Sequence, residues 1–179
     1  MRLSQRTNEA LQTQLMREIE ASYLYLSMAG YCESLGLAGF AKWLHEQSSE
    51  EWTHAMKFRA YIDDRGERVT YGDIGRPDSD FSSISEVFEK ALENEVSVSA
   101  AIADLYSLAE EEKDLATQAF LDWFVTEQVE EEKSVQSVID WLKRIGDSQQ
   151  GLYLLDKELG GGVESGASTA SGSSTGGTG

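Results

Sequence analysis

The sequence has 179 residues, enough for one domain with a sizeable core, and carries 32 acidic against 15 basic residues, a formal net charge of −17. Such a charge repels phosphate backbones and anionic lipid surfaces, so nucleic acids and membranes are poor candidate partners, whereas cations are good ones. The single cysteine, Cys32, cannot form an internal disulfide, which fits a cytoplasmic protein.

The first half of the chain shows two long helical patterns. Apolar residues recur at helical spacing over residues 5–34 and again over residues 37–65, and the two patterns end near Gly36 and at Gly66. The polar stretch 66–82 then breaks the periodicity and contains the only proline of the chain. We expect two helices joined by a short turn, followed by a long connection.

The second half repeats this arrangement. Ser83, followed three residues later by Glu86, forms a capping-box signature that predicts a third helix over residues 84–112. Periodicity predicts a fourth helix over residues 114–145 and a short fifth helix over residues 151–159.

The connections between these elements predict the fold. Each long helix should measure about 45 Å at ~1.5 Å per residue, and the short turns make each helix pair antiparallel. A single long crossover is typical of ferritin-like four-helix bundles, so we predict an all-α fold of that kind with a short C-terminal helix. Residues 1–159 should form this domain. Eight of the sixteen glycines lie within residues 160–179, which favours a disordered tail.

Every long helix carries an acid on its core-facing stripe, near its middle. These acids are Glu18, Glu51, Glu95 and Glu131. In an antiparallel bundle they meet at one level, where four unpaired carboxylates would repel one another. A multivalent cation at their centre removes that repulsion. His54 follows Glu51 at a spacing of three residues, which places both side chains on the same helix face.

Each of these positions also has a plain structural interpretation. A lone glutamate such as Glu18 or Glu95 is usually an edge residue whose carboxylate reaches solvent. His54 alone fits a hydrogen-bonded core histidine. The coincidence of acids from all four helices at one height favours a metal site over these alternatives.

The ligand types indicate which metal the site would take. Carboxylates with one imidazole and no thiolate suit iron or manganese, with zinc able to compete. Two Glu-x-x-His motifs with one glutamate from each of two further helices form a carboxylate-bridged di-metal site. Here Glu51-x-x-His54 is intact, whereas the fourth helix offers Gln128-x-x-Glu131.

At these residues the sequence resembles the prokaryotic non-haem ferritins over residues 5–159. The motifs that carry the resemblance are EEWTHA, EQVEEEK and GLYLLDKEL. The resemblance implies a homo-oligomeric cage of 24 subunits that oxidises Fe(II) with dioxygen or peroxide and stores ferric mineral in its cavity. It also implies a non-haem di-iron site within each subunit.

The resemblance assigns a role to each candidate ligand. The ligands of one iron are Glu18, Glu51 and His54. Glu51 bridges to a second iron, whose other neighbours are Glu95, Glu131 and Gln128. A third iron position found in some members corresponds to Glu50, Glu127 and Glu130, which otherwise are surface acids. Haem is not expected, because Trp52 and Glu131 stand where bacterioferritins carry a methionine and a histidine.

Tyr25 lies two helical turns after Glu18 on the same stripe, so its ring should stand beside the metal site. It is either a packing residue or, as the resemblance implies, an electron donor during oxygen reduction. Two other functions remain open for the whole chain. One is a different di-iron carboxylate oxidoreductase on this fold, and the other is a structural bundle without metal.

Overall fold

The computed structural model describes residues 2–161 and shows α-helices and no β-strand in that range. The helices are α1 (Gln5–Ser34), α2 (Ala38–Asp64), α3 (Ile84–Glu111), α4 (Leu115–Ile145) and α5 (Gln149–Leu159). The bounds of the four long helices agree with the predicted ranges to within a residue at each end. Within this range the helices lack an apolar stretch of the length that a membrane span needs. Of the predicted disordered tail, positions 162–179 lie outside the described residues.

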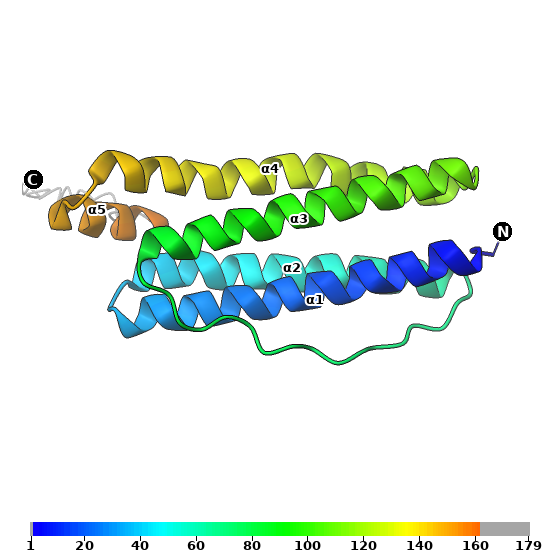
Figure 1. Ribbon diagram of the computed structural model, residues 1–179, viewed down its shortest axis with the longest axis horizontal. Helices are drawn as coiled ribbons and strands as arrows, with labels where there is room; N and C mark the ends of the chain where they lie inside the picture. Colours follow the sequence, from blue (N-terminus) through cyan, green and yellow to red (C-terminus); the bar gives the residue numbers. More distant parts are fainter. Residues whose placement is uncertain (1, 162–179) are drawn as a thin grey trace, which may run out of the picture.

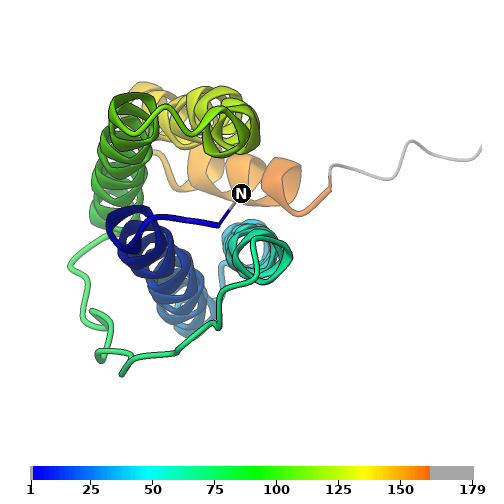
Figure 2. The ribbon, with the colours of Figure 1, turned by 90° about the vertical axis from the view of Figure 1, so that its right-hand side faces the viewer.

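The helices form a four-helix bundle with one long crossover, as predicted (Figure 1). α1 packs against α2 and α3 packs against α4, each pair being antiparallel, and the two pairs face each other through α1 and α3. The view along the bundle in Figure 2 shows the four long helices around a common centre. α5 lies at one end of the bundle and contacts α2 and α4.

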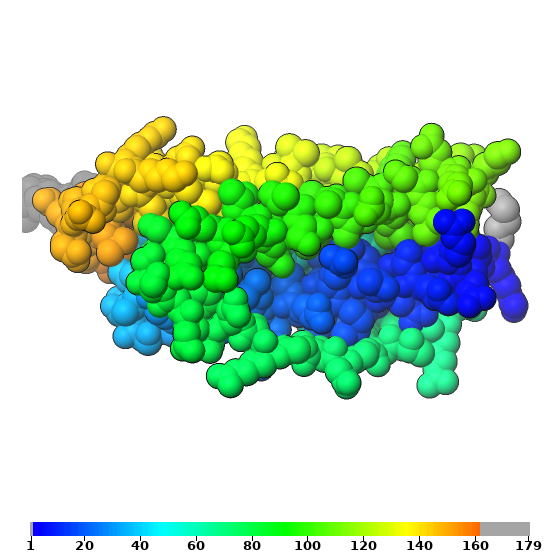
Figure 3. Space-filling view, in the orientation of Figure 1, coloured from blue at the N-terminus to red at the C-terminus, as the bar shows by residue number. Residues whose placement is uncertain are grey.

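The crossover between α2 and α3 runs along the length of the bundle on the side of α1 (Figure 3). Polar side chains of α1 hold it in place. Gln12 accepts a hydrogen bond from the backbone nitrogen of Thr70 at 2.8 Å, and Ser27 donates to the backbone oxygen of Asp78 at 2.6 Å. These contacts satisfy backbone groups of a segment that has no regular structure of its own.

Side-chain caps explain where the helices begin. The Ser83 hydroxyl accepts from the backbone nitrogen of Glu86 at 3.1 Å, as the capping-box signature predicts. In a capping box the Glu86 carboxylate would accept a hydrogen bond from the backbone nitrogen of Ser83. Here it accepts from the backbone nitrogen of Ser82 at 2.6 Å. Ser148 caps α5 through the backbone nitrogen of Gly151 at 3.1 Å. That cap accounts for the fifth helix beginning at Gln149, two residues before the predicted start.

A polar layer divides the hydrophobic core into two clusters. On α2, the cluster nearer α5 includes Phe40 and Leu44, whereas the other cluster includes Phe58 and Ile62. Glu51 lies between them, and the other three long helices show the same order of apolar, polar and apolar buried residues. The bundle is therefore stabilised by apolar packing on both sides of a layer that carries ionisable groups.

α5 is attached to the bundle through the first turn of α2. Leu37 is the N-cap residue of α2, but its side chain cannot accept a hydrogen bond. The carboxylate of Asp156 on α5 caps the helix in its place. Its Oδ1 accepts from the backbone nitrogens of Gly39 at 2.8 Å and Phe40 at 3.1 Å. A carboxylate at a helix N-terminus satisfies free N–H groups and opposes the positive end of the helix dipole.

Candidate metal centre

The four long helices bring six buried polar side chains to one level of the bundle. All are less than a tenth exposed: Glu18 on α1, Glu51 and His54 on α2, Glu95 on α3, and Gln128 and Glu131 on α4. They lie at the mid-helix positions that the sequence stripes predict. Burying ionisable groups is costly unless they are paired or coordinated, so this layer requires a physical explanation.

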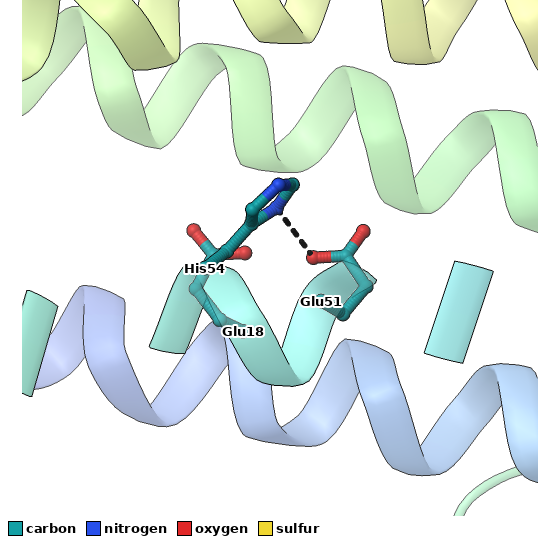
Figure 4. Close-up of side chains that lie close together, drawn as sticks. All are labelled: Glu18, Glu51 and His54. Carbon is teal, nitrogen blue, oxygen red and sulfur yellow. Dashed lines mark ion pairs between the residues drawn. The ribbon is translucent and has the colours of Figure 1, made fainter. Parts of the chain in front are cut away.

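Glu18, Glu51 and His54 form the first group able to hold a metal ion, with one potential ligand atom of each within 4.8 Å of the others. Figure 4 shows the three side chains extending from α1 and α2 into the bundle. Glu51 Oε2 lies 3.4 Å from His54 Nδ1, but the geometry is not that of a hydrogen bond.

Three buried atoms of this group have no hydrogen-bond partner among the described residues. They are Glu18 Oε2, Glu51 Oε2 and His54 Nδ1. An unsatisfied buried polar atom costs about 1–3 kcal/mol, and three of them on neighbouring side chains would be a severe defect in a purely structural core. Two carboxylate oxygens and an imidazole nitrogen are, however, ligands that Fe(II) accepts. The donor set fits iron.

Glu95, on α3, is held by hydrogen bonds. The Tyr25 hydroxyl donates to Glu95 Oε1 at 2.5 Å, which confirms that this ring stands inside the bundle beside the acids. The Gln128 amide donates to Glu95 Oε2 at 3.3 Å and to the Glu95 backbone oxygen at 3.2 Å. Gln128 therefore orients Glu95 in this structure.

A second group able to hold a metal ion contains His54, Glu127 and Glu131. His54 Nε2 lies 3.9 Å from Glu127 Oε1, so the two nitrogens of one imidazole face different groups. The resemblance pairs Glu131 with Glu95 and Glu51. The structure additionally places the Glu131 carboxylate within reach of His54 and Glu127.

The three acids assigned to a third iron position line one open cavity. Glu50, Glu127 and Glu130 surround a space of about 310 Å³ together with Glu131. Glu50 and Glu130 are exposed and Glu127 is half-buried. This cavity connects the buried layer to the surface through a wall rich in carboxylates, which attracts cations.

Burial and mutual repulsion change the protonation of the acids. Burial, with repulsion from Glu51, raises the pKa of Glu18 well above its usual range. Burial and the Glu95 carboxylate do the same to the pKa of Glu51 and raise the pKa of Glu131 to about 8. Burial lowers the pKa of His54. Without a cation this layer favours neutral side chains, so a cation that binds here displaces protons.

Two features of the layer escaped the sequence analysis. Gln14, 2% exposed, donates from Nε2 to Glu18 Oε1 at 2.8 Å. Ser22 and Ser48 donate to each other's backbone oxygens at 2.7 and 2.8 Å, which joins α1 to α2 beside the acids. The spacing of four residues between Gln14 and Glu18 is a signal that could have identified the first contact.

The model of the ferritin-like domain matches residues 8–145. The chain belongs to the ferritin-like family. It is 42% identical over 158 residues to the bacterial non-heme ferritin of Staphylococcus aureus strain USA300, and 42% identical over 157 residues to that of Staphylococcus haemolyticus. Each alignment covers 88% of this chain and 95% of the relative.

Solved structures of ferritins share the fold at similar identity. The open pore ferritin of the hyperthermophilic archaeon Archaeoglobus fulgidus superposes with a TM-score of 0.87 at 44% identity, covering 88% of this chain and 96% of the archaeal one. A closed form of that ferritin, engineered by site-directed mutagenesis, gives the same TM-score and identity. These comparisons confirm the predicted family and fold, including the short fifth helix.

Proposed function

We propose that this chain is an iron-storage ferritin subunit that oxidises Fe(II) with dioxygen or peroxide and deposits ferric mineral inside a cytoplasmic cage of 24 copies. One observation carries this proposal. Glu18, Glu51 and His54 each carry a buried ligand atom without a hydrogen-bond partner among the described residues, and the three residues can offer ligand atoms within 4.8 Å of one another. Membership of the ferritin-like family and relatives named non-heme ferritins support iron as the substrate.

In this proposal the chain's side chains hold two Fe(II) ions in a fixed arrangement. Glu18, Glu51 and His54 hold the first ion, and Glu51 is shared with a second ion near Glu95 and Glu131. Carboxylate oxygens are hard ligands that stabilise Fe(III) over Fe(II), which favours loss of an electron to the oxidant. Gln128 keeps Glu95 oriented through the 3.3 Å contact. Residues 1–159 are the unit that performs this function.

The alternative is another di-iron carboxylate oxidoreductase on the same fold. A hydroxylase, for example, needs an apolar substrate cavity beside its metals. A cavity that adjoins this layer instead has an acid-rich lining, with Trp43 beside Glu46, Glu50, Glu127 and Glu130. A carboxylate-lined space suits the passage of cations and favours storage over organic substrate oxidation.

The test is to add excess Fe(II) in air to the metal-free protein. Stopped-flow absorbance should show rapid formation of ferric species, and electron microscopy should show iron-dense cores inside hollow particles. Particles without cores, or oxidation no faster than in buffer, would contradict storage. Crystals soaked in Fe(II) and measured at the iron edge would then locate the ions.

We expect the cavity acids to form a separate and weaker iron position. Glu127 and Glu130 lie three residues apart on α4 and line the same cavity as Glu50. Because Glu50 and Glu130 are exposed, water competes for the ion and binding should be weaker than in the buried layer. Replacing both Glu50 and Glu130 by alanine should remove this iron from soaked crystals and leave the buried ions. Crystals of the unchanged protein with two ions per subunit and none at these acids would identify them as ordinary surface groups.

We expect Tyr25 to donate an electron during oxygen reduction. Two Fe(II) ions supply two electrons, whereas reduction of dioxygen to water takes four. In this proposal a phenol supplies the third electron as its proton leaves, and an Fe(II) ion at the cavity acids supplies the fourth. Burial and the Glu95 carboxylate raise the pKa of the Tyr25 phenol, so it stays protonated, and Glu95 at 2.5 Å is placed to take that proton.

Tyr25→Phe preserves the ring and removes the hydroxyl, so folding and metal binding should persist. Freeze-quenched samples of the unchanged protein mixed with Fe(II) and oxygen should show a tyrosyl radical signal that the variant lacks. Equal signals in both proteins, or a signal in neither, would make Tyr25 a packing residue.

A further inference from the structure

Gln14 is a buried amide at the border between the polar layer and the second apolar cluster. It lies on α1 one turn before Glu18, is 2% exposed, and has Leu11 and Leu15 of the second apolar cluster beside it in the sequence. Burying an amide in such surroundings costs free energy unless hydrogen bonds replace its contacts with water. A leucine would pack here at lower cost, so the amide itself has a use that packing does not explain.

The contact that Gln14 makes is directed at one oxygen of Glu18. Its Nε2 donates to Glu18 Oε1 at 2.8 Å, and the spacing of four residues aligns the two side chains on one helix face. The second oxygen, Glu18 Oε2, is buried without a hydrogen-bond partner among the described residues. Glu18 also belongs to the group formed with Glu51 and His54. Oε1 is thus held by a hydrogen bond, and Oε2 is free to bind a metal ion.

We propose that Gln14 is a positioning residue for the first metal position. By holding Oε1, it restricts the rotation of the Glu18 carboxylate and leaves Oε2 free to bind an ion shared with Glu51 and His54. When a bound cation keeps Glu18 ionised, the hydrogen bond from the amide is charge-assisted and therefore stronger than a neutral one. Partners of this kind orient the ligands of a metal, and their loss typically weakens metal binding by about 10–100-fold. The inference rests on the metal site of the proposed function.

The test is Co(II) binding by the assembled protein, because Co(II) takes similar ligands and is not oxidised by air. Gln14→Leu removes the amide and adds an apolar side chain of similar size. Calorimetry should show Co(II) affinity at the tightest position about 10–100-fold weaker, with a changed Co(II) absorption spectrum. The thermal midpoint of the metal-free variant should be unchanged or higher, since leucine suits the apolar surroundings.

Gln136→Leu is the matched control. Gln136 lies on α4 and donates to Asp140 at 2.8 Å, which is also an amide-to-carboxylate contact at a spacing of four residues, on the exposed face and outside the polar layer. This variant should bind Co(II) like the unchanged protein. Gln14→Met, which is unbranched like glutamine, serves as a second variant if Gln14→Leu fails to fold, and the same loss of affinity is expected of it.

A double-mutant cycle separates the inference from the site on which it rests. If Gln14 acts through Glu18, Gln14→Leu should have no further effect on Co(II) affinity in a Glu18→Ala background. An equal loss in both backgrounds would overturn the inference in favour of general packing damage. Unchanged binding by Gln14→Leu, with weak binding by Glu18→Ala, would also overturn it and leave the site intact. If Glu18→Ala itself binds Co(II) normally, the proposed site is wrong.

Discussion

Replacing Glu51 by alanine should slow Fe(II) oxidation by more than about 100-fold, because even the loss of a partner outside the ligand shell costs ~10–100-fold. Glu51 is the one residue proposed to contact both ions, and its Oε2 is an unpartnered atom of the group with Glu18 and His54. Stopped-flow absorbance of the assembled variant measures the effect. Glu89→Ala, which removes an exposed acid of α3, is the control and should oxidise Fe(II) normally.

The same substitution should stabilise the metal-free protein at neutral pH. Burial and repulsion from Glu95 raise the pKa of Glu51 in the folded state, so the folded protein binds a proton more tightly there than the unfolded chain. The destabilisation caused by Glu51 is therefore absent below the ordinary glutamate range of about pH 4.3 and grows as the pH rises above it.

The gain in stability of the metal-free protein from Glu51→Ala should follow the same pH dependence. At neutral pH the melting temperature of the chelator-treated variant should equal or exceed that of the unchanged protein. Near pH 4 only the cost of the cavity left by the side chain remains, so the variant should be the less stable of the two. A variant that is less stable at both pH values would show that Glu51 is not under repulsion. If the variant oxidises Fe(II) as fast as the unchanged protein, Glu51 is not a ligand of the site.

Gly39→Ala should detach α5 and destabilise the protein by about 3 kcal/mol or more, the sum expected for overpacking and for weakened hydrogen bonds to a charged group. A Cβ at Gly39 would lie 1.6 Å from the backbone oxygen of Asp156 and 2.6 Å from its carbonyl carbon. Because both contacts are with backbone, rotation of a side chain cannot relieve them. α5 must move away, and the hydrogen bonds that Asp156 accepts from the backbone nitrogens of Gly39 and Phe40 are then lost.

Thermal unfolding and hydrogen exchange of the α5 amides would measure this effect. Gly30→Ala is the matched control, since nothing lies within 4 Å of a Cβ at that helical glycine. It should stabilise the protein by about 0.5–1 kcal/mol, because alanine loses less conformational freedom in a helix. Slow exchange of α5 in the Gly39 variant would show that the two helices can accommodate the extra carbon, and would contradict this prediction.

The long helices and their buried stripes could be predicted because the information is local. A spacing of three or four residues places side chains on one face of a helix wherever the helix packs. That regularity was enough to assign Glu18, Glu51, His54 and Glu95 to the interior, and the structure buries all four. The connection lengths decided the topology in the same way, since a short turn leaves little choice but an antiparallel pair.

The sequence by itself thus determined the helices, the single crossover and the buried acids. Only the tertiary structure decided how these side chains pair. Asp156 caps α2 from another helix, the Glu131 carboxylate lies within reach of His54 and Glu127, and Glu95 accepts a hydrogen bond from Tyr25. These contacts depend on the rotation of each helix about its axis and on side-chain rotamers. Packing of the apolar clusters on both sides fixes those quantities, and periodicity carries no information about them.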